Sequence, residues 1–445
     1  MKMMNWEKVF SSKRFGMENY HDDKKHARTE YQRDYDRLIF SSPFRRLQNK
    51  TQVFPLPGSI FVHNRLTHSL EVASVGRSIG DIVGQGLRDR HPEMLAHFEE
   101  IGSIVAAACL AHDMGNPPFG HSGEKAISTF FSEGKGKMMQ EQVESEGGCW
   151  TDFTCFEGNA NVMRLLMHQF YGKRKGGFAM TYSTLASIVK YPYSSAIAGG
   201  KNKFGFFASE QNDYACIADD LGIMRVSDSP LRFVRYPLVY LVEAADDICY
   251  QVMDIEDAHK LHLVTTEKTF ELLLGFFDGE RRERRIKNMN MLTDVNEQIA
   301  YLRASVIGLL VNECSRVFLE NEEVILSGKY QGTLIDNISQ GAHEAYRTCS
   351  KFAFDNIYFS KDVLDVELAG YRIIGFLLDI FTNAILKPDH AYSKLLLERV
   401  PKQYQPQSED LYTRLQSIVD FVSGMTDVYA LDLYRKITGM GLPSI

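Results

Sequence analysis

The segment IVAAACLAHDMGNPPFGHSGE, residues 104–124, joins an apolar run to a turn that carries four titratable side chains. Its apolar residues recur at three- and four-residue steps, which predicts a helix over 101–115 that buries one face. The positions on that face are Ile101, Ile104, Val105, Ala108 and His112. Burial of His112 beside Asp113 costs free energy unless both side chains have a hydrogen-bonding or metal partner, and a divalent cation would be a partner for both. For an isolated His-Asp pair, the commoner arrangement is a histidine bonded to a backbone carbonyl and an aspartate in a turn.

Helical periodicity also dominates the rest of the chain and predicts an all-α fold. The other clear amphipathic segments are 69–87, 235–258 and 366–386. Strand-like alternation is scarce, and 203–210 is the best candidate for a short hairpin or loop. The polar or glycine-rich segments 133–150 and 191–205 are expected to be irregular.

The composition and charge of the chain exclude several classes of protein. The chain has 445 residues and a net charge of −7, so it has no global basic field for nucleic acid or an anionic membrane, although a local basic pocket remains open. No apolar run has the length of a membrane span, and the first residues lack the apolar core of a signal peptide. The seven cysteines are scattered without a CxxC pair, which is typical of reduced thiols. We therefore expect a cytoplasmic protein without a membrane partner.

Two further segments offer groups that could complete a metal site. His68, in NRLTHSLEV (64–72), begins an amphipathic helix, with Arg65 three residues earlier on the same face. The helix expected over 235–258 carries a second, acidic stripe, made of Glu243, Asp246, Tyr250, Asp254 and Asp257. Like charges stacked in this way repel one another, so a cation or ligand facing the stripe would explain it. A solvated acidic face explains this helix equally well, and a lone His68 is more often a surface or packed histidine.

Longer motifs then point to a family. The segments 31–54, 65–72, 111–124, 156–166 and 240–250 resemble the deoxyguanosine triphosphate triphosphohydrolases, a branch of the HD-domain metal-dependent phosphohydrolases. These motifs span about the first half of the chain in the family's order, and 369–381 is similar but less distinctive. The resemblance implies an all-α HD-domain core with an N-terminal segment and irregular insertions over 1–260. A C-terminal helical region, 261–445, is expected to pack on this core rather than fold independently.

The resemblance also implies one divalent metal ion per site. The ligands would be His68, His112, Asp113 and Asp246. Asp246 is preferred to Asp247 because Tyr250 and Asp254 then lie on the same helix face as the ligand. Mixed imidazole and carboxylate ligands suit Mg, Mn, Fe, Co, Ni or Zn, and the spacing does not choose among them.

The acid/base pair that the resemblance implies is His121 with Glu124, where the carboxylate would orient the imidazole and raise its pKa. Without the family, His121 is a turn residue, and Glu124 is a carboxylate in the first turn of a helix. The substrate-binding residues that the resemblance implies are Gln52, Arg65, Tyr250, Asp254, Lys190 and, less distinctively, Lys203. Gln52, Tyr250 and Asp254 would hold the deoxyribose, and the cationic residues would hold the phosphates. A core aromatic explains Tyr250 equally well, and a surface lysine explains Lys203.

The implied reaction is hydrolysis of a deoxynucleoside triphosphate, with dGTP first, to deoxynucleoside and inorganic triphosphate. Water would attack the α-phosphorus, and His121 would move a proton at one end of the line of attack. Rival hypotheses are a broader enzyme activated by another dNTP, a nucleotidase or phosphodiesterase of the HD class, and a non-catalytic nucleotide sensor. Binding of single-stranded DNA through the basic and aromatic residues of 31–50 is a weaker alternative to a salt-bridged helix. The family also implies a homo-oligomer.

Overall fold

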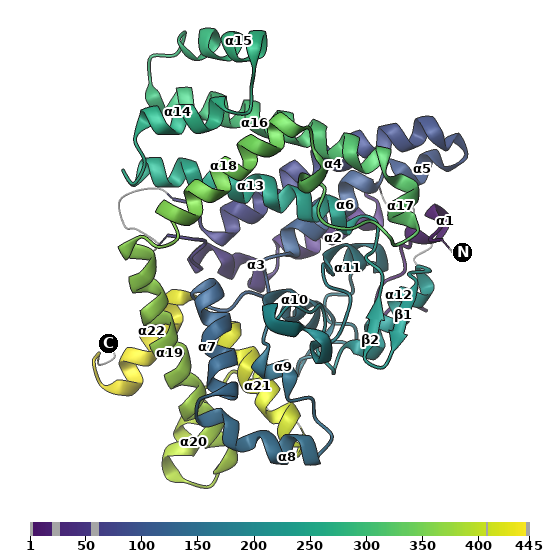
Figure 1. The fold of residues 1–445 in the computed structure, drawn as a ribbon. Helices are drawn as coiled ribbons and strands as arrows, with labels where there is room; N and C mark the ends of the chain where they lie inside the picture. The colour runs from purple at the N-terminus through teal and green to yellow at the C-terminus, as the bar shows by residue number, and fades with distance from the viewer. Residues whose placement is uncertain (1–2, 20–26, 55–61, 406–407, 442–445) are drawn as a thin grey trace.

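The computed structural model describes residues 3–19, 27–54, 62–405 and 408–441. The prediction of an all-α fold is confirmed: helices make up most of the described chain (Figure 1). Within those residues the sheet structure consists of one antiparallel pair, β1 (Arg225–Asp228) with β2 (Leu231–Phe233). This pair was not predicted from the sequence, because its strands are short and their exposed residues do not alternate.

Four long helices form the centre of the upper part of the molecule in Figure 1. They are α4 (Arg65–Arg90), α6 (Ile101–Ala111), α13 (Val239–Lys260) and α16 (Val295–Glu320). Helix α6 is apolar on nearly every side and lies buried against α4, α13 and α2 (Glu30–Ile39). Gly80 allows α4 to approach it closely, because a Cβ there would lie 2.8 Å from the Gly102 Cα atom. The segment predicted as a helix over 69–87 is helical throughout. Of those predicted over 101–115 and 235–258, α6 ends at Ala111, before the turn, and α13 begins at Val239.

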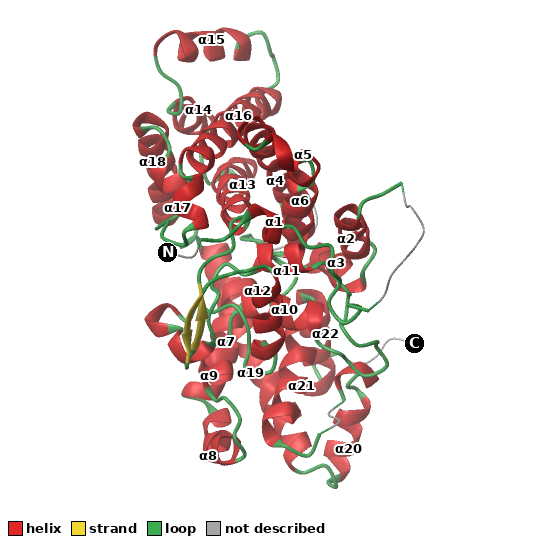
Figure 2. Cartoon of the chain, turned by 90° about the vertical axis from the view of Figure 1, so that its right-hand side faces the viewer, coloured by secondary structure: helices red, strands yellow, loops and turns green. Residues whose placement is uncertain are grey.

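A second group of helices lies below the first, and Figure 2 shows the same separation from another side. Its axis is α19 (Lys361–Leu386), the helix predicted over 366–386, which packs against α7 (Gly120–Ser132). Buried residues from 126–207 and 373–433 share one apolar cluster here. The other large cluster runs from Met4 to Cys349. Each cluster thus combines residues from both sides of position 260, and the boundary expected there stays an expectation.

The remaining helices complete the two groups. They are α1 (Trp6–Val9), α3 (Ser42–Arg46), α5 (Leu95–Phe98), α8 (Gln140–Ser145), α9 (Thr151–Thr154), α10 (Gly158–Met167), α11 (Tyr182–Ile188), α12 (Gln211–Asp220), α14 (Thr266–Leu274), α15 (Gly279–Met289), α17 (Glu322–Leu326), α18 (Gln340–Asn356), α20 (Ala391–Glu398), α21 (Leu411–Ser423) and α22 (Asp427–Thr438).

The expectation that 133–150 is irregular is wrong in part. A 3₁₀-helix over Lys135–Met139 leads into α8. Met139, Val143 and Trp150 are buried in the lower apolar cluster, so a few apolar anchors order a segment whose average composition is polar. The segment 203–210 forms a loop, as one of the two alternatives predicted, and contacts Ser194 through a single bridge at Phe206.

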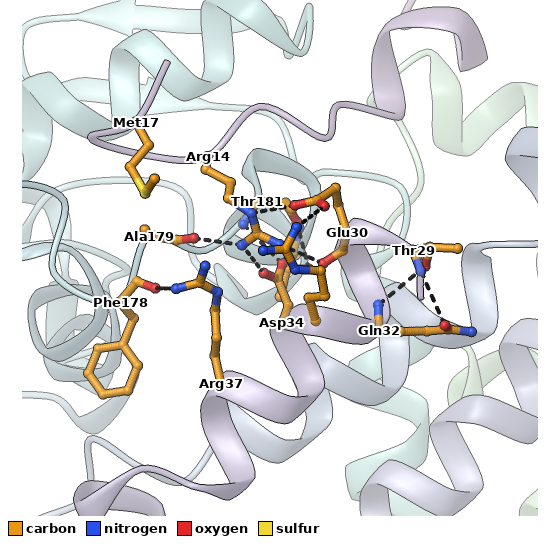
Figure 3. A network of polar contacts seen from close by, with 12 residues as sticks. Arg14, Met17, Thr29, Glu30, Gln32, Asp34, Arg37, Phe178, Ala179 and Thr181 are labelled. Carbon is orange, nitrogen blue, oxygen red and sulfur yellow. Dashed lines mark hydrogen bonds and ion pairs between the residues drawn. The ribbon is translucent and has the colours of Figure 1, made fainter. Parts of the chain in front are cut away.

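Helix α2, inside the basic and aromatic segment 31–50, is held by buried charge (Figure 3). Asp34 is fully buried and lies 2.6 Å from Arg14 Nη1, and it also accepts a hydrogen bond from the Thr181 backbone N–H at 2.9 Å. A capping box between Thr29 and Gln32 begins the helix. The aspartates of this segment are thus paired with arginines, Asp34 with Arg14 and Asp36 with Arg28, but both arginines come from outside residues 31–50.

The sequence was expected to hold no apolar run of the length of a membrane span, but one stretch, Pro92–Ala111, is long and apolar enough by length and composition. It contains α5 and α6, and 61% of its most apolar window is buried inside the protein. Burial of this kind is typical of a core helix, which passes the same test of length and composition.

A buried charge network joins the two groups of helices. Arg164, on α10, donates to Asp420 of α21 through Nε and Nη2, both at 2.7 Å, and to Glu210 Oε1 at 2.9 Å. The side chain of Arg164 is 3% exposed. Burial would lower the pKa of this guanidinium, but the two carboxylates raise it, so Arg164 stays charged. Removing one member leaves buried charge without a partner.

We expect Arg164→Met to lower the free energy of unfolding by about 3–5 kcal/mol, because Asp420 and Glu210 would then lose their cation. The matched control is Arg316→Met, since the Arg316 side chain is 43% exposed and pairs with Glu313 and Glu320 on the surface. That change should cost about 1 kcal/mol or less. Urea denaturation followed by circular dichroism measures both, and equal losses would contradict the role of the buried network.

Candidate active site

The residues predicted for the site converge on one pocket of about 270 Å³. All but two of them line it: Gln52, Arg65, His112, Asp113, His121, Glu124, Lys190, Lys203, Asp246 and Tyr250. The two others lie directly behind its wall. His68 contacts Asp246, and Asp254 is buried one turn beyond Tyr250 on α13. Segments far apart in the chain thus bring their polar side chains to one place.

The metal ligands implied by the resemblance gather at the junction of α4, α6 and α13. His68 Nε2 lies 3.1 Å from Asp246 Oδ1, and His112 Nε2 lies 3.4 Å from the same oxygen. The ligand atoms of these three residues all lie within 4.8 Å of one another. Asp113 lies at the edge of the group, with Oδ1 3.7 Å from His112 Nε2. The geometry is that of a site which a single ion could occupy.

The unsatisfied atoms in this group fit a metal ion. His112 Nε2 is buried and has no hydrogen-bond partner, and Asp113 Oδ2, which also has none, lies 2.9 Å from Arg65 Nη1 in an ion pair. The other ring nitrogen, His112 Nδ1, contacts the Cys109 carbonyl oxygen at 2.5 Å, which directs Nε2 into the site. Burial would lower the pKa of His112, but Asp113 and Asp246 raise it to about 9. The group therefore attracts positive charge, which a divalent cation supplies.

Asp246 and Asp247 have different surroundings, although they are adjacent. Only Asp246 contacts both histidines, and this contact with His112 and His68 holds its pKa low in spite of burial. Asp247 faces Lys190 instead, and burial raises its pKa to about 7. The geometry thus supports the choice of Asp246 as a ligand.

His121 and Glu124 lie at the start of α7, after a tight turn. Phe119 and Gly120 both adopt left-handed conformations, with φ of 62° and 57°. A side chain at Gly120 would lie 2.5 Å from Arg65 Nη2, so glycine leaves room for this arginine to reach Asp113 Oδ2 at 2.9 Å. The turn therefore brings an acid/base candidate and a cation next to the metal group.

The two side chains form a hydrogen-bonded pair, and their acid/base role stays a prediction. His121 Nδ1 lies 2.9 Å from Glu124 Oε2, and Glu124 Oε1 accepts from the Gly158 N–H at 2.7 Å. The hydrogen bond and charge of Glu124 raise the pKa of His121. Burial opposes ionisation of Glu124, but His121 lowers its pKa. Since the His121 side chain is 71% exposed, its other nitrogen is free to meet a ligand in the pocket.

The sugar-binding candidates have a partner that the sequence did not indicate. Tyr358, just after α18, donates a hydrogen bond to Asp254 Oδ2 at 2.7 Å. Its ring also stacks on Tyr250, with centroids 5.9 Å apart. Burial raises the pKa of Asp254 to about 7, although the Tyr358 hydroxyl favours the carboxylate. Gln52 Oε1 is buried without a partner, as expected of an atom that awaits a ligand.

Both lysines proposed for phosphate binding are paired with glutamates at the pocket wall. Lys190 Nζ lies 3.1 Å from Glu243 Oε1, and Lys203 donates to Glu157. Sequence reasoning missed Glu157 as a pocket residue, although it stands in the quoted segment 156–166. The pairing lowers the positive charge available to a phosphate, so the assignment of the lysines stays a prediction.

Comparisons with known proteins agree with this geometry. The HD domain model matches residues 65–149, which carry three of the four candidate ligands, and a phosphohydrolase-associated domain model matches 337–436. The match identifies the chain as a hydrolase of the HD class. HD domains are metal-dependent, and the His/Asp group of this chain is suited to hold an ion.

Relatives identify the family more closely. A deoxyguanosinetriphosphate triphosphohydrolase-like protein of Pseudomonas aeruginosa is 36% identical over 99% of this chain and 100% of its own length. A like-named protein of Synechocystis is 34% identical over 99% of the chain and all of its own length. A deoxyguanosinetriphosphate triphosphohydrolase of Yersinia enterocolitica is 29% identical over 97% of the chain and 98% of its own length. The chain belongs to the deoxyguanosinetriphosphate triphosphohydrolase family, as its motifs predicted.

Asp246→Asn should weaken binding of Mn²⁺ by at least about 100-fold, because an amide replaces the carboxylate shared by both histidines. Asp247→Asn is the matched control: it alters the adjacent residue, which faces Lys190, and should leave the affinity within a few-fold. Titration calorimetry with Mn²⁺ measures both. An equal loss in the two variants would contradict the assignment of Asp246.

The His121 imidazole should titrate above its ordinary pKa of 6.5, and Glu124→Gln should lower the midpoint toward 6.5. The sign follows because the carboxylate stabilises the charged imidazolium more than the neutral imidazole. Glu133→Gln removes the same charge near the other end of α7, where it does not contact His121, and should leave the midpoint unchanged. NMR of histidine-labelled protein follows the titration, and an unchanged midpoint in Glu124→Gln would rule out the coupling.

Proposed function

We propose that the protein hydrolyses deoxynucleoside triphosphates, with dGTP as the preferred substrate, to deoxynucleoside and inorganic triphosphate. The observation that carries the proposal is the placement of the His121–Glu124 pair beside the metal group, in a pocket also lined by Arg65, Gln52 and Tyr250. The names of the full-length relatives support a triphosphohydrolase and supply dGTP as the first substrate to test.

Four positions would hold the metal ion: His68, His112, Asp113 and Asp246. When bound, a divalent ion supplies Lewis-acid stabilisation of the charge on the α-phosphate. Arg65, which lies 2.9 Å from Asp113, would neutralise the β- and γ-phosphates together with the lysines. His121 then moves one proton, either from the attacking water or to the leaving 5′ oxygen, and Glu124 holds its imidazole in orientation.

The sugar would lie between Gln52 and the Tyr250–Tyr358 pair. Gln52 Oε1, which is buried without a partner, would accept from the 3′ hydroxyl. Tyr250 is held from behind by the Tyr358 ring, so it cannot easily withdraw from C2′. A 2′ hydroxyl would then meet the ring, which favours deoxyribonucleotides.

Several finer properties belong to the same proposal. The protein would act in the cytoplasm as a homo-oligomer, and a second dNTP could act as activator. The hypothesis of a broader enzyme differs from this proposal in base preference and in its need for another dNTP as activator, and the rival HD nucleotidase and phosphodiesterase activities differ in their products. A sensor or single-strand DNA-binding protein would keep the pocket without turnover.

His121→Ala should lower kcat by a factor of roughly 10² to 10⁴ and leave Mn²⁺ binding intact, because the residue is an acid/base group and not a ligand. His97→Ala, an exposed histidine on α5, is the control and should keep full activity. The assay supplies Mg²⁺ or Mn²⁺ and each dNTP singly and in pairs, and separates nucleoside, triphosphate, diphosphate and phosphate.

The products decide between the hypotheses. Deoxyguanosine plus intact triphosphate from dGTP alone supports the proposal, and turnover only with mixed dNTPs supports an activated, broader enzyme. Monophosphate or diphosphate products would contradict the reaction proposed. Full activity in a folded, metal-loaded His121→Ala variant would remove the role of His121.

A further inference from the structure

Asp427 lies outside the HD domain but contacts two loops that carry active-site residues. It occupies the first turn of α22 and is 7% exposed. Its Oδ2 accepts a hydrogen bond from the Thr51 backbone N–H at 2.8 Å, and its Oδ1 accepts from the Phe119 N–H at 3.0 Å. One buried carboxylate thus bridges two segments that are 68 residues apart in sequence (119 − 51).

Each of these segments positions a candidate site residue. Thr51 directly precedes Gln52, and it forms a bridge with Asn64, the N-cap residue of α4. Phe119 is the N-cap residue of α7 and stands two positions before His121. The carboxylate of Asp427 therefore sets the distance between the sugar-binding loop and the acid/base residue.

The turn before α7 needs such a support. Phe119 has a positive φ of 62°, which non-glycine residues seldom adopt, and its side chain makes no capping hydrogen bond to α7. Two other side chains, Lys50 and Asn161, also hold the turn by hydrogen bonds. Lys50 donates to the carbonyls of Asn116 and Ser423, and Asn161 donates to the Gly115 carbonyl at 2.7 Å.

A simpler role for Asp427 would be stabilisation of α22, since an acidic residue suits the first turn of a helix. The N-cap of α22 is already provided by Thr426, whose side chain accepts from the Tyr429 N–H at 3.1 Å. Both carboxylate oxygens of Asp427 face outward from the helix to backbone groups of other segments. Its contacts are those of a residue that orders the site.

We propose that Asp427 is a positioning residue for the reaction, holding Gln52 and His121 in register through the Thr51 and Phe119 amides. This inference rests on the proposed function. Loss of the carboxylate lets the sugar loop and the start of α7 move independently. Both recognition of the 3′ hydroxyl and proton transfer then weaken, because a misplacement of about 1 Å can cost about 100-fold in rate.

The test compares dGTP with its 2′,3′-dideoxy analogue, which lacks the 3′ hydroxyl. Asp427→Ala should lower kcat/KM for dGTP about 100-fold and reduce the preference for dGTP over the analogue about tenfold. Asp427→Asn keeps one acceptor oxygen and should show a smaller loss of both. Thr426→Ala weakens the same helix without touching either loop, so it should lower the melting temperature but leave the preference unchanged.

Hydrogen exchange provides a readout that does not depend on turnover. The Thr51 and Phe119 amides should lose protection in Asp427→Ala and keep it in Thr426→Ala. Unchanged protection, or an unchanged preference between the two nucleotides in a folded Asp427 variant, would overturn the inference. If the wild type hydrolyses no dNTP, the proposed function fails and the catalytic role of Asp427 fails with it. Exchange at the two amides would then still report whether Asp427 holds the loops together.

Discussion

The rest of the structure depends on the contact between the Asp246 carboxylate and two histidines. Its Oδ1 lies 3.1 Å from His68 Nε2 and 3.4 Å from His112 Nε2. This contact brings together α4, the residue directly after α6, and α13 in the apolar centre of the molecule. Buried carboxylates and imidazoles with unsatisfied atoms are costly there unless a cation joins them. Apolar helices make the site rigid, and the charge of the site makes it suitable for a metal ion.

The second group of helices, around α19, forms the other side of the active-site pocket. The turn after α6 leads into α7, which carries His121 and Glu124, and α7 packs on α19. Asp427 of α22 accepts a hydrogen bond from the Phe119 N–H of that turn, and Lys50 donates both to the Asn116 carbonyl of the turn and to the Ser423 carbonyl of α21. Arg164 joins α10 to Asp420 of α21. The C-terminal region therefore supports the acid/base side of the pocket, while α4, α6 and α13 support the metal side.

Residues with a local signature could be predicted from the sequence, and residues placed by tertiary contacts could not. The helices α4, α6, α13 and α19 follow from apolar periodicity, and the site residues on them were implied by the resemblance of their motifs to a known family. Tyr358 and Asp427 lie in no motif quoted for the site, and they reach it only because distant helices fold back onto it. The helical turns within 133–150 were missed for a similar reason, since three buried side chains outweigh a polar average.

The most direct test of the account is hydrolysis of dGTP in ¹⁸O-labelled water with the metal-loaded protein. Attack of water on the α-phosphorus breaks the bond between this phosphorus and the 5′ oxygen. The account therefore predicts one ¹⁸O atom in the inorganic triphosphate and none in deoxyguanosine. Label in the 5′ hydroxyl of deoxyguanosine, or in released phosphate or diphosphate, would contradict the reaction assigned to this site.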